Sequence, residues 1–228
     1  MIQKEEKRME RTIRVTGRGR ISVKPDVMQL NIRLEETFKD YEKAVAASAE
    51  KTETLRNALL GAGFDPKDLK TTSFNISAEY ESYCDSKNNW RNRFVGYKFH
   101  HALYIKFAND NKLLGKAIYA VTKSGVNSEI SVNYTVSDPE PAREELLKNA
   151  VKDSRVKATA LAESAGVALG EILSMDYSWG QINIYSRPIE NITYGAAKMA
   201  MADECYSFDI EPEDIDLEDT VTIVWEIK

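Results

Sequence analysis

The chain has few of the residues that usually carry catalysis or metal binding. Its 228 residues include two histidines and two cysteines. Cys84 and Cys205 stand far apart, with no CxxC pair and no neighbouring histidine, so the ligand spacing of a zinc site is missing. We expect two reduced structural thiols, as in a reducing cytosol, while an oxidising compartment would permit one disulfide.

The two histidines are adjacent, in a segment that alternates like a β-strand. Successive side chains of a strand point to opposite faces, so His100 and His101 cannot act on one substrate or hold one metal ion. We expect His101 on the apolar face and His100 at the surface. Serine elbows, complete phosphate loops and dinucleotide fingerprints are also missing. Glu79 and Glu81 share a strand face, which is typical of an exposed surface. We therefore expect a non-enzyme, without cofactor or metal.

Long apolar runs are absent as well, and the sequence offers no membrane span. The N-terminus lacks the apolar segment of a signal peptide, so we expect a cytoplasmic protein, although a removed signal would leave the same sequence. The net charge of −5 disfavours nucleic acid as a partner. Basic residues gather in residues 4–24, and residues 199–227 have none. Two solvated surfaces, or steering of one copy onto another, would both explain this asymmetry.

The periodicity that is present predicts an α+β fold. Residues 1–10 are charged and unpatterned, which predicts a disordered arm. Residues 11–228 contain no Gly-, Pro- or Ser-rich linker and are read as a single domain. The expected order is β-β-α-β-β-α-β-α-β-β, a largely antiparallel sheet with three helices on one face. One long helix, starting after Asp138-Pro139, has an inner face rich in small residues, among them Ala158 and Ala162.

Two segments are candidates for an interaction surface. Residues 84–93 form a polar loop at the end of a long hairpin, and this loop carries one large apolar residue, Trp90. Residues 194–202 combine small residues with Tyr194, Met199 and Met201 inside a stretch without clear periodicity. Methionine side chains adapt to varied partners, and long irregular segments are often functional. Solvation of the loop and packing of the second segment on its own domain are the alternatives.

The residues Val15-Thr16-Gly17-x-Gly19, Val23-x-Pro25-Asp26 and Gly96-Tyr97 form a pattern together with Ala162-x-x-x-Ala165-Gly166-x-x-x-Gly170. With the closing segment 210–227, this pattern resembles the SIMPL-domain family. The resemblance implies a SIMPL-type α+β domain without a known cofactor. Some bacterial relatives are associated with oxidative-stress tolerance, some assemble into rings, and an animal relative is an adaptor for a signalling kinase. Many relatives carry export signals, which this sequence lacks.

Two hypotheses of function follow. The first is a non-catalytic, self-associating binding or scaffold protein, whose contacts come from strand edges, the Trp90 loop and the methionine segment. It predicts a homo-oligomer, linked by the resemblance to stress tolerance. The second is a small-ligand-binding protein or an enzyme with a pocket under the 180–215 segment. An exposed apolar patch would favour the first, and a pocket with converging polar groups would favour the second.

Overall fold

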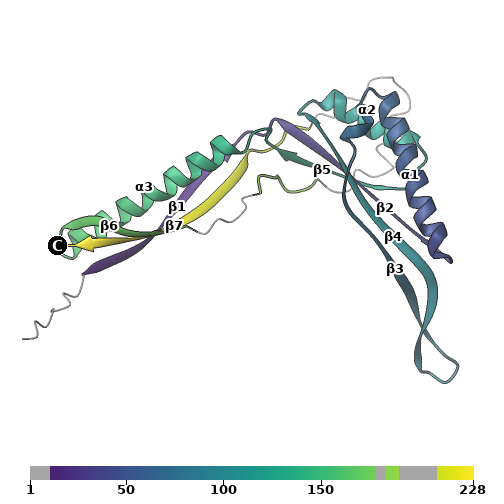
Figure 1. Cartoon of the computed structure of the whole chain (residues 1–228), viewed down its shortest axis with the longest axis horizontal. Coiled ribbons are helices and arrows are strands. Elements are labelled where there is room, and N and C mark those ends of the chain that lie inside the picture. Colours follow the sequence, from purple (N-terminus) through teal and green to yellow (C-terminus); the bar gives the residue numbers. More distant parts are fainter. Residues whose placement is uncertain (1–10, 178–182, 190–209) are drawn as a thin grey trace, which may run out of the picture. The chain divides into compact units, whose positions relative to one another are not determined.

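The computed structural model describes residues 11–177, 183–189 and 210–228. The predicted N-terminal arm, residues 1–10, lies outside them. The described chain divides into two compact units. Unit 1 takes the residues up to Lys24, those from Val136 to Ile184 and those from Asp214 onward; unit 2 takes the residues between. Each unit has its own antiparallel sheet and its own helical cover (Figure 1).

Unit 1 is a three-stranded sheet covered by one long helix. The sheet has the order β1-β7-β6, and α3 lies along it (Figure 1). The elements are β1 (Thr12–Val23), α3 (Glu140–Ser164), β6 (Leu169–Asp176) and β7 (Ile215–Ile227). The inner face of α3 is made of small side chains, as predicted, and Ala158 and Ala162 are both buried. The apolar pattern of the helix also predicts that Leu161 fills space against the sheet, but Leu161 is 51% exposed.

Two glycines bring α3 onto β1. A side chain at Gly17 would lie 2.1 Å from the carbonyl oxygen of Ala150, and one at Gly19 would lie 2.0 Å from that of Leu146. Glycines inside an alternating segment predict a bend or bulge in the strand. Instead, β1 pairs with β7 without interruption from Thr12 to Val23. The glycines remove side chains where the helix backbone touches the strand, which is a packing requirement and not a break in pairing.

Unit 2 is a four-stranded sheet of order β3-β4-β2-β5, with two helices on one face (Figure 1). Alternate residues of β2 (Met28, Leu30, Ile32 and Leu34) are buried beneath the helices, and the residues between them form a polar face. The elements are β2 (Val27–Phe38), α1 (Tyr41–Gly61), a 3-10 turn (Pro66–Asp68), β3 (Lys70–Cys84), β4 (Trp90–Ala108), α2 (Asn111–Lys123) and β5 (Glu129–Thr135).

The ends of the helices follow local sequence signals. Asp110 accepts a hydrogen bond from the backbone N–H of Lys112 and caps α2, and Asp138 does the same for Glu140 at the start of α3. Gly125 and Gly166, after these helices, adopt positive φ angles of 72° and 69°. Asp40 makes no capping hydrogen bond at α1, but its carboxylate pairs with Lys43 at 2.7 Å. These signals explain why the helices could be placed from sequence.

The α+β class and the order of elements along the chain are confirmed. The single sheet that was expected is two sheets, one in each unit. This difference arises because β1 and β7 pair with each other, although they stand at opposite ends of the chain. Strand spacing along a sequence does not reveal such a pairing. That the two units behave as one domain stays a prediction.

Candidate interaction surface

The hairpin of β3 and β4 continues beyond the rest of its sheet (Figure 1). Strand β2 pairs with β4 only as far as Tyr97, so from Gly96 to Trp90 the hairpin consists of two strands. At Glu79 the register shifts, and β4 contributes one extra residue, Val95. This bulge places Phe94 on the same side as Tyr97, which strict alternation would forbid.

The bulge creates a continuous row of aromatic rings. Tyr41 of α1 packs on Tyr97 with ring centres 5.5 Å apart, Tyr97 on Phe94 at 5.3 Å, and Phe94 on Tyr80 at 5.7 Å. By alternation, Trp90 lies on the same side as Phe94. We call these five residues the aromatic face. Tyr80 is 61% exposed and Trp90 is 77% exposed, so much of this face is in contact with water.

Charged side chains lie on the opposite side of the hairpin. Arg93 pairs with Glu81 at 2.8 Å, and Arg91 pairs with Asp85 at 2.7 Å. Backbone N–H groups of Asn89 and Lys87, together with Arg91, lower the pKa of the Asp85 carboxyl. The hairpin is therefore amphipathic: ion pairs occupy one side, and the other side has no ionised group between Tyr80 and Trp90.

The predicted site residues meet different outcomes. Trp90 is exposed, as expected, but it is the first residue of β4, opposite Cys84, and not part of the loop. The loop itself covers only residues 85–89. Tyr194, Met199 and Met201 lie outside the described residues. Trp90 is therefore accessible, while an interaction role for Trp90 and for the methionine segment stays a prediction.

A polar cluster around His101 lies between α1 and the part of the β3–β4 hairpin that belongs to the sheet. Nδ1 of His101 is 3.0 Å from Ser48 Oγ and 3.3 Å from Thr52 Oγ1, and its Nε2 is 3.0 Å from Thr71 Oγ1. Burial and the nearby Arg56 lower the pKa of His101. Ser48 is only 2% exposed, so its hydroxyl is closed to a substrate and serves to position α1 on β4. His100 faces the other side and lies 3.2 Å from Glu35.

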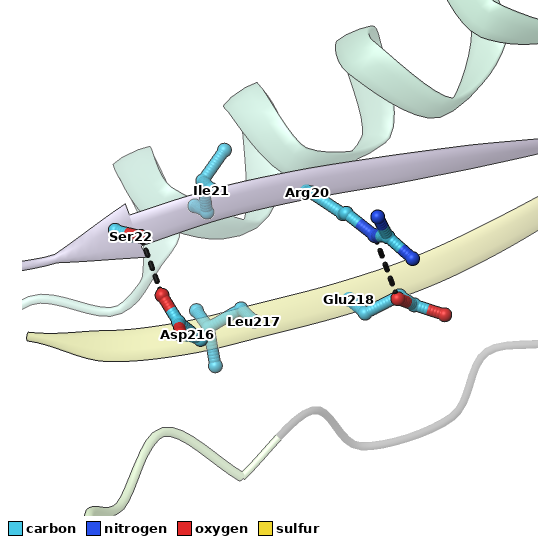
Figure 2. Close-up of a pocket in the computed structure, with 6 residues that line it drawn as sticks. All are labelled: Arg20, Ile21, Ser22, Asp216, Leu217 and Glu218. Carbon is cyan, nitrogen blue, oxygen red and sulfur yellow. Dashed lines mark hydrogen bonds and ion pairs between the residues drawn. The ribbon is translucent and has the colours of Figure 1, made fainter.

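Unit 1 contains an open pocket of about 520 Å³ over β1 and β7 (Figure 2). Its polar lining groups bind one another. Arg20 donates to Glu218 at 2.9 Å, and Ser22 donates to Asp216 at 2.5 Å. Arg18 also contacts Glu218, at 3.1 Å. The polar side chains that line this pocket are therefore already bound to one another.

Sequence reasoning missed two features that the structure brings together. Phe94 joins the aromatic face only because of the bulge at Val95, and Gly96 beside it was the one local sign, since glycine inside a strand often marks a bulge. The cluster around His101 had a usable signal. Ser48 and Thr52 are one turn apart on the inner stripe of α1, and a polar pair there requires a polar partner on the strand beneath.

Comparisons with known proteins identify relatives of this chain. A 26 kDa periplasmic immunogenic protein of Brucella melitensis biotype 1 is 31% identical over 167 residues, which are 72% of this chain and 65% of that protein. The chain thus spans slightly less than two thirds of that relative. An uncharacterised protein, YggE, of Edwardsiella ictaluri is 24% identical over 93% of this chain and 85% of its own length.

Among the described helices, none has the length and apolar character needed to cross a membrane. The SIMPL family, described as a protein of unknown function (DUF541), matches residues 13–225. This match includes the glycines that seat α3 on β1 and the whole β3–β4 hairpin. The chain belongs to the SIMPL family.

Proposed function

We propose that this protein is a non-catalytic binding or assembly protein that associates with further copies of itself through the aromatic face. One observation carries the proposal: a two-stranded extension displays three exposed rings, Tyr80, Phe94 and Trp90, on a side that has no ionised group between Tyr80 and Trp90. Two strands alone are marginally stable in water, and large exposed apolar patches usually mark an interaction site. Covering these rings would stabilise both the hairpin and the complex, since aromatic side chains dominate binding hot spots.

Charge supports a second copy as the partner. The chain carries a net charge of −5, so the net charges of two copies oppose their association. The aromatic face lacks ionised groups, because Glu81 and Asp85 lie on the opposite side of the hairpin. On that side they pair with Arg93 and Arg91. Two copies can therefore approach each other there without bringing like charges together.

The variant Trp90→Ala tests this proposal. It removes the most exposed ring at the end of the hairpin and should weaken association by about tenfold or more, since hot-spot truncations cost about 2 kcal/mol. Leu161→Ala is the control, because it also removes an exposed apolar side chain but from α3 in unit 1. Light scattering over a concentration series measures both, and circular dichroism verifies folding. Equal association of Trp90→Ala and wild type would contradict the role of the aromatic face.

The compartment is a separate question, and the relatives bear on it. Two relatives are named periplasmic proteins, from Brucella melitensis and Brucella abortus. These names favour export over the cytoplasmic location that the sequence suggested. Fractionation of the native host, followed by detection of this protein, distinguishes the two locations.

The alternative function is binding of a small ligand, or catalysis, in a pocket under the 180–215 segment, and most of that segment lies outside the described residues. The pocket that is described, over β1 and β7, offers Arg20, Ser22, Asp216 and Glu218, but these groups already bind one another. A ligand would have to break those contacts, and their loss would offset part of its binding energy. Native mass spectrometry of the purified protein would reveal a retained small molecule, and that result would shift the proposal to this alternative.

A further inference from the structure

A β-bulge at the start of β3 brings a threonine hydroxyl to His101. The pairing of β3 with β4 shifts register between Thr71 and Ser73, so Thr72 is the extra residue. In a strictly alternating strand, Thr71 and Phe74 would lie on opposite sides. The bulge places both on the side of His101. The ring of Phe74 lies 5.1 Å from the imidazole, and Oγ1 of Thr71 lies 3.0 Å from its Nε2.

The hydroxyl groups around this ring differ in their access to water. In the described chain, His101 contacts the hydroxyls of Ser48, Thr52 and Thr71. Ser48 is 2% exposed and Thr52 is 6% exposed, so neither can meet a molecule from solution. Thr71 lies at the outer strand of the sheet and is exposed. Of these hydroxyls, that of Thr71 is therefore the one that a reagent can reach.

The hydrogen bonds also define which ring nitrogen carries the hydrogen. Thr52 donates its hydroxyl hydrogen to the carbonyl oxygen of Ser48 at 2.8 Å, so toward Nδ1 of His101 its oxygen can only accept. Nδ1 therefore carries the hydrogen, and in the neutral ring Nε2 has a free lone pair. Burial and the nearby Arg56 lower the pKa of His101, which favours this neutral ring. Thr71 consequently donates its hydroxyl hydrogen to Nε2.

This arrangement is the one that activates a hydroxyl group as a nucleophile. A neutral imidazole accepts the hydroxyl hydrogen, and a further group on its other nitrogen holds the ring in that tautomer. Here Thr71 supplies the hydroxyl, His101 is the base, and the buried oxygens of Ser48 and Thr52 orient the ring. A base placed in this way accelerates attack by about 10²–10⁴-fold.

We propose that Thr71 is a site of covalent acylation by activated esters or thioesters. The Thr71 oxygen attacks the carbonyl carbon of the acyl donor, and Nε2 of His101 takes up the hydroxyl proton. The bond from the acyl carbon to the leaving oxygen or sulfur breaks, and the leaving group departs with that electron pair. His101 then returns the proton to the leaving group or to water, and an ester of Thr71 remains. The acyl group stays on the chain, so this modification requires no turnover and does not depend on self-association.

The wild-type protein allows a first test with p-nitrophenyl acetate as the acyl donor. Peptide mass spectrometry with fragmentation locates the acetyl groups after reaction at about pH 7.5, above the ordinary histidine pKa. Thr72 is the internal control, because it is also exposed but donates to the carbonyl of Ala102 at 3.1 Å. We expect Thr71 to be acetylated at least about tenfold faster than Thr72. Equal rates at the two residues, or no acetyl group on Thr71, would overturn the proposal.

Variants of the ring test the role of the base. His101→Gln should lower the acetylation of Thr71 to the level of Thr72, while His100→Gln, on the opposite face of β4, should retain it. Circular dichroism verifies folding. Ser48→Ala combined with Thr52→Val keeps the ring but removes the acceptors at Nδ1, and it should also slow the reaction about tenfold or more. If Thr71 reacts at the wild-type rate in either folded variant, His101 does not activate it and the proposal is wrong.

Discussion

His101, expected on the apolar face of its strand, links three hydroxyl groups from two other elements to β4. Ser48 and Thr52 come from α1, and Thr71 comes from β3. Thr52 already donates to the carbonyl of Ser48, so its oxygen acts as an acceptor toward the ring. A single side chain thus fixes both the helix and the edge strand at the root of the hairpin.

We expect His101→Ala to lower the free energy of unfolding by about 1–3 kcal/mol, because it removes packing and leaves buried hydroxyls without their partner. His100→Ala is the matched control on the opposite face, where the ring pairs with a half-exposed Glu35, and it should be nearly neutral. Urea denaturation of both variants measures the difference. Equal losses would refute the assignment of the two rings to opposite faces.

The lowered pKa of His101 also predicts a pH dependence. In the unfolded chain the ring takes up a proton near its ordinary pKa of about 6.5, while in the folded protein it stays neutral to lower pH. Stability from this residue is therefore fully present above about pH 6.5 and falls as the pH drops through that value toward the folded-state pKa.

Urea denaturation at about pH 7.5 and about pH 5.5, on either side of the ordinary histidine pKa, measures this effect. Wild type should lose more stability between these pH values than His101→Gln, which cannot take up a proton. An equal loss in the two proteins would show that other groups account for the acid sensitivity.

At the scale of elements, the glycines of β1 show that a glycine motif inside a strand can serve helix packing and not a bend or bulge. The pattern Gly17-x-Gly19 marks a contact with α3, since a side chain at either position would overlap the helix backbone. Sequence reasoning identified the small inner face of α3 but could not tell which strand it would meet. Pairings between distant segments, such as β1 with β7, leave no periodic signal in either segment.

We expect Gly17→Ala to cost about 1–3 kcal/mol or more, because the added carbon would force the helix and strand apart. Gly61→Ala is the control: it lies at the end of α1 with no atom near the added carbon, and alanine favours a helix. Thermal denaturation should therefore show a clear loss for the first variant and no loss for the second. A neutral Gly17→Ala would contradict the close approach of α3 and β1.

The inner face of α3 gives an independent prediction. Ala158→Leu should overpack this contact and cost about 1–3 kcal/mol, while Val156→Leu, at an exposed position of the same helix, should change little. The midpoint of urea denaturation reports both. If the two midpoints agree, the helix turns a different face to its sheet.

The hairpin shows where prediction from sequence ended. Its two strands and its exposed tryptophan follow from alternation and from the polar residues around Trp90. The aromatic face does not, because the extra residue at Val95 moves Phe94 to the other side of the strand. Gly96 is a sign of a bulge, but which residue is left unpaired depends on how the two strands fit together.

At the scale of the whole molecule, each of the two units contains one sheet covered by helices. Each sheet has an outer strand, β3 or β6, with no further strand beside it among the described residues. The proposed self-association would give a role to the aromatic face, which is exposed among the described residues. The opposite charges of residues 4–24 and 199–227 would add an electrostatic attraction between copies, and salt would weaken that attraction.

The solution mass of the wild-type protein tests self-association most directly. Light scattering at micromolar concentration, in about 0.1 M and about 1 M salt, separates the two contributions, because the screening length falls from about 10 Å to about 3 Å. We expect a species larger than the 25.8 kDa chain in both solutions, since contacts through rings and strand backbone survive high salt. A mass of 25.8 kDa under both conditions would contradict the account.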